Sequence, residues 1–220
     1  MDGLPALVRV DAEGPERVRE GHSYANPAEA ERAASLVAEL LEAGVRPENV
    51  GVITPYDAQV DEIRRALSDA GVPNHGDVEV DTVDAFQGGE REAVVVSLVR
   101  SNDEGNVGFL GRGEDGPRRL NVALTRAERF LALVGDWETL RASTDGNDGE
   151  NGDDGENGYG ENGDDAADLY RSLYDYLDER SRTRTTNSAV ERSGLLVRPC
   201  ASGYRHGRPG TPTRSCRRRR

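Results

Sequence analysis

Residues 93–99 read Ala-Val-Val-Val-Ser-Leu-Val and form the most strand-like stretch of the chain. A second apolar run, Val50–Thr54, is also nearly continuous, which is typical of a strand buried on both faces of a sheet. Shorter strand signals occur at 6–10, 78–81 and 130–134. Helical patterns separate these segments, and strands that alternate with helices predict an α/β fold with a mostly parallel sheet.

The helix expected between the first two strands begins at Asn26. Asn26 is a favourable N-cap, Pro27 suits the first turn, and Glu29 follows the cap by three residues. The inward face of this helix is predicted to hold Ala30, Ala33, Ala34, Val37, Leu40 and Leu41. A second amphipathic helix is expected to bury Val60, Ile63, Ala66 and Leu67, and two further helices are predicted at 117–127 and 136–141.

All 28 basic residues of the chain are Arg, because the sequence contains no Lys. A Walker A loop needs a Lys on the β- and γ-phosphates, so the chain is not a complete P-loop NTPase. Schiff-base chemistry and Lys-dependent nuclease sites are excluded for the same reason. The 41 acidic residues give a formal net charge of −13, and an acidic composition without Lys suggests a halophile-like protein of a high-salt cytoplasm, or a GC-rich genome.

The apolar content argues against a membrane protein. Hydrophobic residues make up 35% of the chain, and no apolar run approaches the roughly 20 residues that span a bilayer. The N-terminus lacks the apolar core of a signal peptide, and two Cys make no disulfide framework. We therefore expect a cytoplasmic protein that does not contact a membrane.

Composition divides the chain into four segments. A folded body is predicted at 1–143, an acidic Gly/Asn/Asp/Glu linker at 144–165, a short helix at 166–180 and a basic tail at 181–220. The linker has too little apolar surface to offset the entropy lost on ordering. The spacing of Cys200, His206 and Cys216 in the tail fits no zinc motif, and no metal site is predicted. We interpret the tail as disordered or out of frame, in preference to a nucleic-acid-binding arm.

Three polar segments adjoin the buried strands, and they contain Thr54-Pro55, Gln87-Gly88-Gly89-Glu90 and Arg126. We expect all three beyond the carboxyl ends of the strands, where α/β sheets bind ligands. Each segment also has a purely structural interpretation. Pro55 ends a strand, the two Gly make a tight connection, and Arg126 extends from its helix to solvent or pairs with Glu128 or Glu90. In the functional interpretation, the Thr54 hydroxyl and the adjacent N–H groups meet a phosphate oxygen, the backbone of the two Gly approaches a ligand closely, and the Arg126 charge is directed at a partner.

Together the three segments closely resemble the C-terminal motifs of superfamily 1 helicases. VGVITPYDAQ (50–59) is similar to motif IV, VDTVDAFQGGEREAVVVSLVRSN (80–102) to motif V, and RRLNVALTRAERFLALVGD (118–136) to motif VI. The nearest group is the superfamily 1B branch, which includes the nonsense-mediated-decay RNA helicase, the immunoglobulin-mu-binding helicase and the replication helicase-nuclease. The likeness covers about residues 7–140, and three long motifs in order make it specific.

The resemblance implies a second RecA-like helicase domain, which belongs to the P-loop NTPase superfold but lacks the P-loop. Such a domain closes over ATP that a first RecA-like domain binds. By similarity, Arg126 is the arginine finger, and Gln87 and Glu90 lie beside the γ-phosphate and the ribose or Mg²⁺. The implied ATP-binding set is Glu90, Gly88, Gly89 and Arg126. The implied contacts to single-stranded DNA or RNA are Thr54, Pro55 and Thr82.

The sequence departs from the helicase pattern in two respects. Many family members place a basic residue where this chain has Gly89, with Arg91 two residues further on. The chain also contains no Walker A loop, and no Asp-Glu Walker B pair or Gln-Tyr-Arg segment precedes the body. We therefore expect this chain to be the C-terminal half of an ATP-dependent helicase, inactive as an ATPase alone. ATP and Mg²⁺ would bind only with a separately encoded or lost Walker A/B-bearing domain.

Two alternatives stay open at this point. The chain is a stand-alone, non-catalytic module that binds single-stranded nucleic acid, or it is an inactive truncated remnant. Backbone contacts carry no base sequence information, so DNA and RNA are equally compatible with these motifs.

Overall fold

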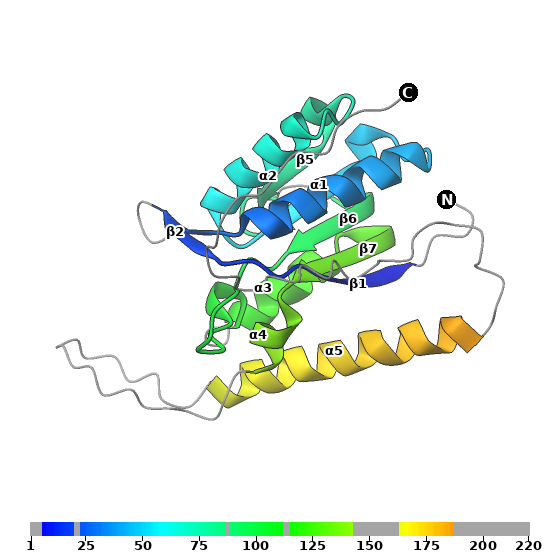
Figure 1. Cartoon of the computed structure of the whole chain (residues 1–220). Helices are drawn as coiled ribbons and strands as arrows, with labels where there is room; N and C mark the ends of the chain where they lie inside the picture. Colours follow the sequence, from blue (N-terminus) through cyan, green and yellow to red (C-terminus); the bar gives the residue numbers. More distant parts are fainter. Residues whose placement is uncertain (1–5, 20–22, 87–88, 112–114, 143–162, 187–220) are drawn as a thin grey trace, which may run out of the picture.

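The computed structural model describes residues 6–19, 23–86, 89–111, 115–142 and 163–186, with side chains of the last segment described at 168–179. Its centre is a five-stranded parallel sheet with the strand order β1-β7-β6-β4-β5. The strands are β1 (Leu7–Asp11), β4 (Val50–Thr54), β5 (Glu79–Thr82), β6 (Arg91–Ser97) and β7 (Ala127–Gly135). The predicted α/β fold with a parallel sheet is confirmed (Figure 1).

The central strands are buried on both faces, as their apolar runs predict. In β4, Val50 and Val52 join one core cluster and Ile53 joins the other. In β6, Ala93 and Val95 lie on the first side and Val94 and Val96 on the second. This alternation gives each strand two apolar faces, so a layer of helices must cover each face of the sheet.

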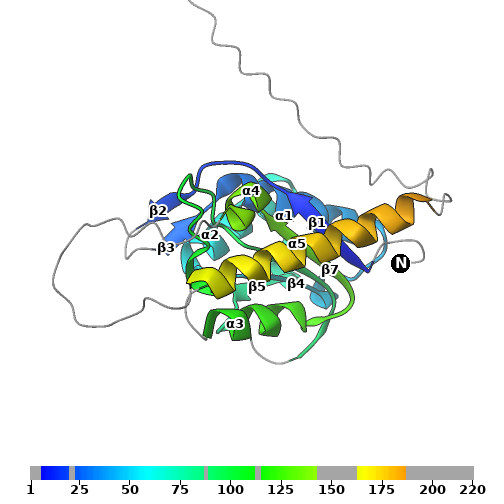
Figure 2. The same ribbon diagram turned by 90° about the horizontal axis from the view of Figure 1, so that it is seen from below.

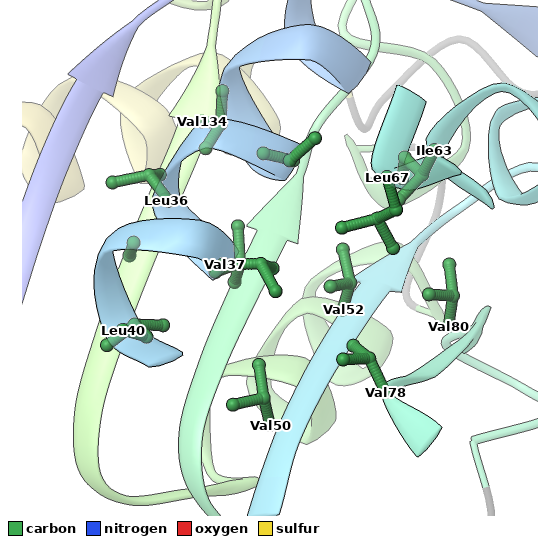
Figure 3. Packing of buried hydrophobic residues seen from close by; sticks show 14 of the residues in the cluster. Leu36, Val37, Leu40, Val50, Val52, Ile63, Leu67, Val78, Val80 and Val134 are labelled. Atoms are coloured by element: carbon green, nitrogen blue, oxygen red, sulfur yellow. The ribbon is translucent and has the colours of Figure 1, made fainter. Parts of the chain in front are cut away.

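The first face is covered by α1 (Pro27–Glu42) and α2 (Asp57–Asp69). Leu36, Val37 and Leu40 of α1 pack above the central strands, and Ile63 and Leu67 of α2 pack toward β4 and β5 (Figure 3). Of the inward positions predicted for the two helices, Leu41 and Ala66 are only partly buried. Short 3₁₀ turns, η2 (Pro47–Asn49) and η3 (His75–Asp77), lead into β4 and β5.

The opposite face is covered by η4 (Gly108–Gly111), α3 (Asp115–Leu124), α4 (Trp137–Arg141) and α5 (Gly163–Thr186). Figure 2 shows α5 crossing this face between α3 and α4. Leu120, Trp137, Tyr170 and Leu177 each stay at most 2% exposed there. The helix predicted at 117–127 starts two residues earlier and ends at Leu124, because Arg126 already precedes β7.

A small antiparallel hairpin, β2 (Arg17–Arg19) with β3 (Ser23–Ala25), precedes α1 and has no counterpart in the sequence prediction. The predicted linker at 144–165 and tail at 181–220 lie largely outside the described residues, and so do Cys200, His206 and Cys216. Within the described part of the chain, no helix is both long and apolar enough to cross a bilayer.

Candidate functional site

The predicted site residues lie at two opposite edges of the sheet. Thr54 and Thr82 are paired at the carboxyl ends of β4 and β5, as expected. Glu90 and Arg126 instead come directly before β6 and β7, so they lie at the amino edge. The expectation that all three polar segments share the carboxyl edge is therefore wrong. In a parallel sheet, each connection must return to the amino end of the next strand, and these two residues end such connections.

At the amino edge, Arg126 is joined to the first residue of β6. The backbone N–H of Arg91 donates to the carbonyl oxygen of Arg126 at 2.8 Å. The Arg126 side chain is half-buried, and its Nε is buried without a hydrogen-bond partner in the described part of the chain. Among the described residues, no ion pair joins Arg126 to Glu128 or Glu90, so the pairing expected in the structural interpretation is not observed. A buried unpaired donor of this kind costs about 1–3 kcal/mol.

Glu90, Gly89 and Arg91 also lie at the amino edge, and they differ in exposure and in the contacts that they make. Glu90 is exposed, and no described residue forms an ion pair with its carboxylate. Gly89 has φ +112°, a conformation that favours glycine. Gln87 and Gly88 lie outside the described residues. The Arg91 guanidinium is bound by the Glu79 carboxylate and lies over the Phe86 ring at 5.7 Å, so it is already engaged.

At the carboxyl edge, the two predicted threonines differ in access. Thr54 is 1% exposed, and its hydroxyl has no hydrogen-bond partner among the residues that the structure describes. Pro55 is buried. Thr82 is half-exposed, and its Oγ1 accepts from the N–H of Ala85 at 3.3 Å. The Thr54 carbonyl accepts from the N–H of Val83 at 3.0 Å, which ties the end of β4 to the segment after β5. Thr82 therefore lies nearer to solvent than Thr54.

A buried polar network, which sequence analysis did not find, lies beside this edge. The Glu29 carboxylate accepts from the Ser97 hydroxyl and from the N–H of Val99, both at 2.8 Å. The side-chain amide of Gln59 donates to Ser97 Oγ at 3.0 Å, and its oxygen accepts from the Asn26 N–H at 2.7 Å. Asn26 also caps α1, as predicted, by accepting from the Glu29 N–H at 3.3 Å. The network joins the first turns of α1 and α2 to the end of β6.

This network holds the backbone of Val99 in an unusual conformation. Val99 has φ +76°, where a β-branched residue is strained. Glu29 accepts from its N–H, and Asn26 Nδ2 donates to its carbonyl at 3.3 Å. Complete burial raises the pKa of the Glu29 carboxyl from 4.5 to about 8, the hydrogen bonds from Val99 and Ser97 oppose that shift, and the charge of Asp136 adds to it. Glu29 is consequently protonated in much of the folded protein at neutral pH.

The turn at Val99 directs Arg100 into a buried ion pair. The Arg100 guanidinium donates to both carboxylate oxygens of Glu16, at 2.8 and 3.0 Å. The same carboxylate accepts from the N–H of Ser101 at 2.8 Å, and Arg100 lies 4.3 Å over the ring of Tyr24. This pair fastens the hairpin and the segment before it to the loop that follows β6. The described segments hold no group of three or more His, Cys, Asp or Glu placed to bind a metal ion.

The parallel sheet with helices on both faces is a RecA-like α/β fold, and it carries three segments that resemble superfamily 1 helicase motifs. The chain belongs to the AAA domain family, whose pattern matches residues 4–138. It is 43% identical over 123 residues, 54% of its length, to the Regulator of nonsense transcripts 1 homolog of Neurospora crassa. It is 44% identical over 119 residues, again 54% of its length, to the DNA polymerase alpha-associated DNA helicase A of Schizosaccharomyces pombe.

A third relative is the DNA-binding protein SMUBP-2 of Rattus norvegicus, with 43% identity over 121 residues, or 55% of this chain. The chain spans only 11%, 17% and 11% of the lengths of these three relatives. A crystal structure of the C-terminal domain of a "possible DNA helicase" from Lactobacillus plantarum WCFS1 is 18% identical. That comparison has a TM-score of 0.42 and covers 60% of this chain and 74% of the other.

Proposed function

We propose that this chain acts as the C-terminal half of an ATP-dependent superfamily 1 helicase. It would supply an arginine finger at its amino edge and single-strand contacts at its carboxyl edge to a half that carries the P-loop. The family membership supports the helicase class, and the absence of Lys from the sequence supports the need for a second half. We propose the folded body at 1–143, the acidic linker and the basic tail predicted from composition, with α5 (Gly163–Thr186) in place of the helix expected at 166–180.

The observation that carries this proposal is the side chain of Arg126. Its buried Nε has no partner within the described residues, and an arriving phosphate would satisfy this donor once the side chain turned toward it. A guanidinium also suits the charge that develops on a transferred phosphoryl group, because it presents several donors in a rigid plane. The amino edge therefore fits a nucleotide phosphate presented from another polypeptide.

ATP with Mg²⁺ would supply the phosphoryl group, and the Walker motifs of the other half would hold both. In this chain, Arg126 would donate hydrogen bonds to the γ-phosphate oxygens and stabilise their charge in the transition state. Glu90 would accept from the ribose or bind through Mg²⁺, and Gln87 with Gly88 and Gly89 would line the phosphate. The Glu90 carboxylate is exposed and forms no ion pair with a described residue, which supports its assignment.

At the carboxyl edge we propose that Thr82, Pro55 and neighbouring backbone N–H groups contact the phosphates of single-stranded DNA or RNA. The half-exposed position of Thr82 supports its role. The Thr54 hydroxyl is enclosed and would reach a phosphate only if the segment after β5 moved away. Closure of the two halves around ATP would then move the bound strand.

The test is ATP hydrolysis by the full chain mixed with a separately expressed polypeptide that carries the Walker A and B motifs of the same helicase. We expect the mixture to hydrolyse ATP and each part alone to be inactive. Arg126→Ala should lower kcat by about 10³-fold or more, since arginine fingers contribute on that order. Arg129→Ala is the matched control, because Arg129 is a nearby exposed arginine of β7 that pairs with Glu92. Full activity in Arg126→Ala would refute the finger assignment.

A stand-alone binding module is the second candidate, and the half-exposed position of Thr82 at the carboxyl edge is compatible with it. Sequencing the locus in every frame separates the two. A neighbouring frame that encodes GxxxxGK[ST] and an Asp-Glu box supports the divided helicase. Unrelated neighbours support the binding module, which then requires single-strand binding by the chain alone. Failure of that binding would leave an inactive remnant.

A further inference from the structure

Arg91, the first residue of β6, is joined to the proposed arginine finger through its backbone. The Arg91 N–H donates to the carbonyl oxygen of Arg126 at 2.8 Å. The pairing of β6 with β7 loses its regular register between Arg91 and Ala93, immediately after this hydrogen bond. Irregularities of this kind bend a strand and redirect its side chains. The regular ladder therefore begins beyond Arg126, and the hydrogen bond from Arg91 ties the Arg126 backbone to the sheet.

Three contacts hold the Arg91 side chain in place. Its guanidinium forms an ion pair with Glu79 of β5 and lies 5.7 Å over the Phe86 ring. Its Nη1 donates to the carbonyl oxygen of Glu90 at 3.2 Å. The Arg91 Nε is buried without a hydrogen-bond partner in the described part of the chain, which is unfavourable. The other contacts of the guanidinium must therefore outweigh the loss at Nε.

The path of the Arg91 side chain depends on a glycine. Because β4 lies between β6 and β5, the side chain must cross β4 to reach Glu79. It crosses at Gly51, which is paired with Glu79 in the sheet. A Cβ added at Gly51 would lie 2.8 Å from the Phe86 ring and 3.4 Å from Arg91 Cγ, so only glycine leaves room for both. Arg91 thus links β5, β6 and β7 at the amino edge.

We propose that Arg91 is a positioning residue for Arg126. Its side chain fixes the backbone at the start of β6, and its N–H passes that position on to the Arg126 backbone. Arg91 does not bind phosphate itself, because its guanidinium is engaged by Glu79, Phe86 and the Glu90 carbonyl. A charged group stabilises a transition state best when its position is set in advance. This inference rests on the proposed function and deepens it by naming the residue that sets the place of the finger.

The first test is a double-mutant cycle on ATP hydrolysis by the full chain mixed with the polypeptide that carries the Walker motifs. Arg91→Met removes the guanidinium and keeps an apolar stem. It should lower kcat about tenfold through misplacement of Arg126, with little change in KM for ATP, because the other half binds most of the nucleotide. In the Arg126→Ala background it should lower kcat by no more than about twofold, since the side chain through which Arg91 acts is already missing.

Two further variants sharpen the cycle. Arg129→Met is the matched control, because Arg129 lies on β7 near the same edge and pairs with Glu92. It should leave kcat unchanged in both backgrounds. Arg91→Lys keeps a cation for Glu79 and should recover part of the activity that Arg91→Met loses.

A second measurement is independent of catalysis. Hydrogen exchange at the amide of residue 91, in the full chain alone, reports on the hydrogen bond to the Arg126 carbonyl. Arg91→Met should speed this exchange about tenfold relative to the amides of Val94 and Val96 in the same strand, which correct for any general loss of stability. Arg129→Met should leave the ratio unchanged.

The outcomes separate this inference from the proposed function. An equal fall in kcat in both backgrounds, or an unchanged exchange ratio in Arg91→Met, overturns the positioning role and leaves the proposed function in place. Full activity of Arg126→Ala, or an inactive mixture, overturns the proposed function and the positioning role together. Circular dichroism checks the fold of each variant, and Arg91→Lys replaces Arg91→Met in both measurements if the latter fails to fold.

Discussion

Glu29 shows how one buried carboxyl group sets the chemistry of its surroundings. It has no access to solvent, yet it accepts hydrogen bonds from Ser97 and Val99. Burial favours the neutral acid, whereas both hydrogen bonds favour the anion, and burial is the larger effect. The residue therefore keeps its proton in the folded chain at a pH where an unfolded chain has released it.

The stability of the protein should consequently fall as the pH rises from about 4.5 to about 8 on account of Glu29. In that window the native state binds one proton more than the unfolded state, and the loss amounts to a few kcal/mol, as an order of magnitude. Glu29→Gln imitates the neutral acid and should remove this contribution. The free energy of unfolding, measured in urea across the pH range, gives the difference between the two proteins.

Glu31→Gln is the control for this experiment, because Glu31 is exposed on the same helix and should leave the pH profile unchanged. Parallel profiles for the parent protein and Glu29→Gln would show that Glu29 titrates normally, and would contradict the prediction.

At the scale of elements, the loop after β6 is held to the N-terminal hairpin by Arg100 and Glu16. Their side chains are 7% and 14% exposed, so each charge depends on the other for its compensation. The hydrogen bonds from Ser101 and Asn102 to the same carboxylate extend this joint into the loop. A hairpin of two three-residue strands gains its fixed position from such anchors, since two short strands alone are not stable.

Arg100→Ala should therefore lower the free energy of unfolding by about 3–5 kcal/mol, because it leaves the Glu16 carboxylate buried without its partner. Arg46→Ala provides the comparison, since Arg46 pairs with Glu48 at side-chain exposures of 69% and 54% and should change stability by at most about 0.5 kcal/mol. Denaturant unfolding of both variants measures the two effects. Similar losses in both would mean that burial of the pair is unimportant.

The sequence patterns predict the helices and strands better than they predict which distant residues come into contact. The strands β4 and β6 follow from unbroken apolar runs, and α1 follows from its cap and its apolar spacing. The hairpin strand β2 has only three residues, and all three are exposed. Such a short strand with no buried face leaves no apolar pattern that predicts it from the sequence. The Glu29 network joins residues tens of positions apart in the sequence. Arg126 lies at the amino edge of the sheet because it ends the connection that leads into β7. Neither placement has a local signal in the sequence.

At the scale of the whole molecule, α5 joins a core that the family pattern does not reach. That pattern ends at residue 138, whereas Tyr170 and Leu177 of α5 are buried against the face of the sheet that carries α3 and α4. The Tyr174 ring lies between the guanidinium groups of Arg9 and Arg141, at 4.2 and 4.1 Å. The helix therefore behaves as a structural part of the sheet domain, despite the acidic segment predicted before it.

Leu177→Ala should destabilise the entire domain by about 2–5 kcal/mol, the range for removing a large aliphatic side chain from a core. A single cooperative transition with a lowered midpoint, followed by circular dichroism and by Trp137 fluorescence, is the expected result. Tyr176→Ala changes the neighbouring exposed residue and should have little effect. An unaltered midpoint in Leu177→Ala would mean that α5 unfolds independently of the sheet.

The candidate sites at the amino edge and at the carboxyl edge of the sheet are separated by the length of its strands, so a rotation at one edge displaces the other. The seven residues of β6 make a stiff rod of about 23 Å at roughly 3.3 Å per residue, with Arg91 at one end and Ser97 at the other. If the amino edge is the pivot, a tilt of about 10° sweeps the opposite end through about 4 Å, close to the roughly 3.4 Å between successive nucleotides of a stacked strand. Under the proposed function, a small angular change on nucleotide binding would displace the carboxyl edge by about the spacing of one base.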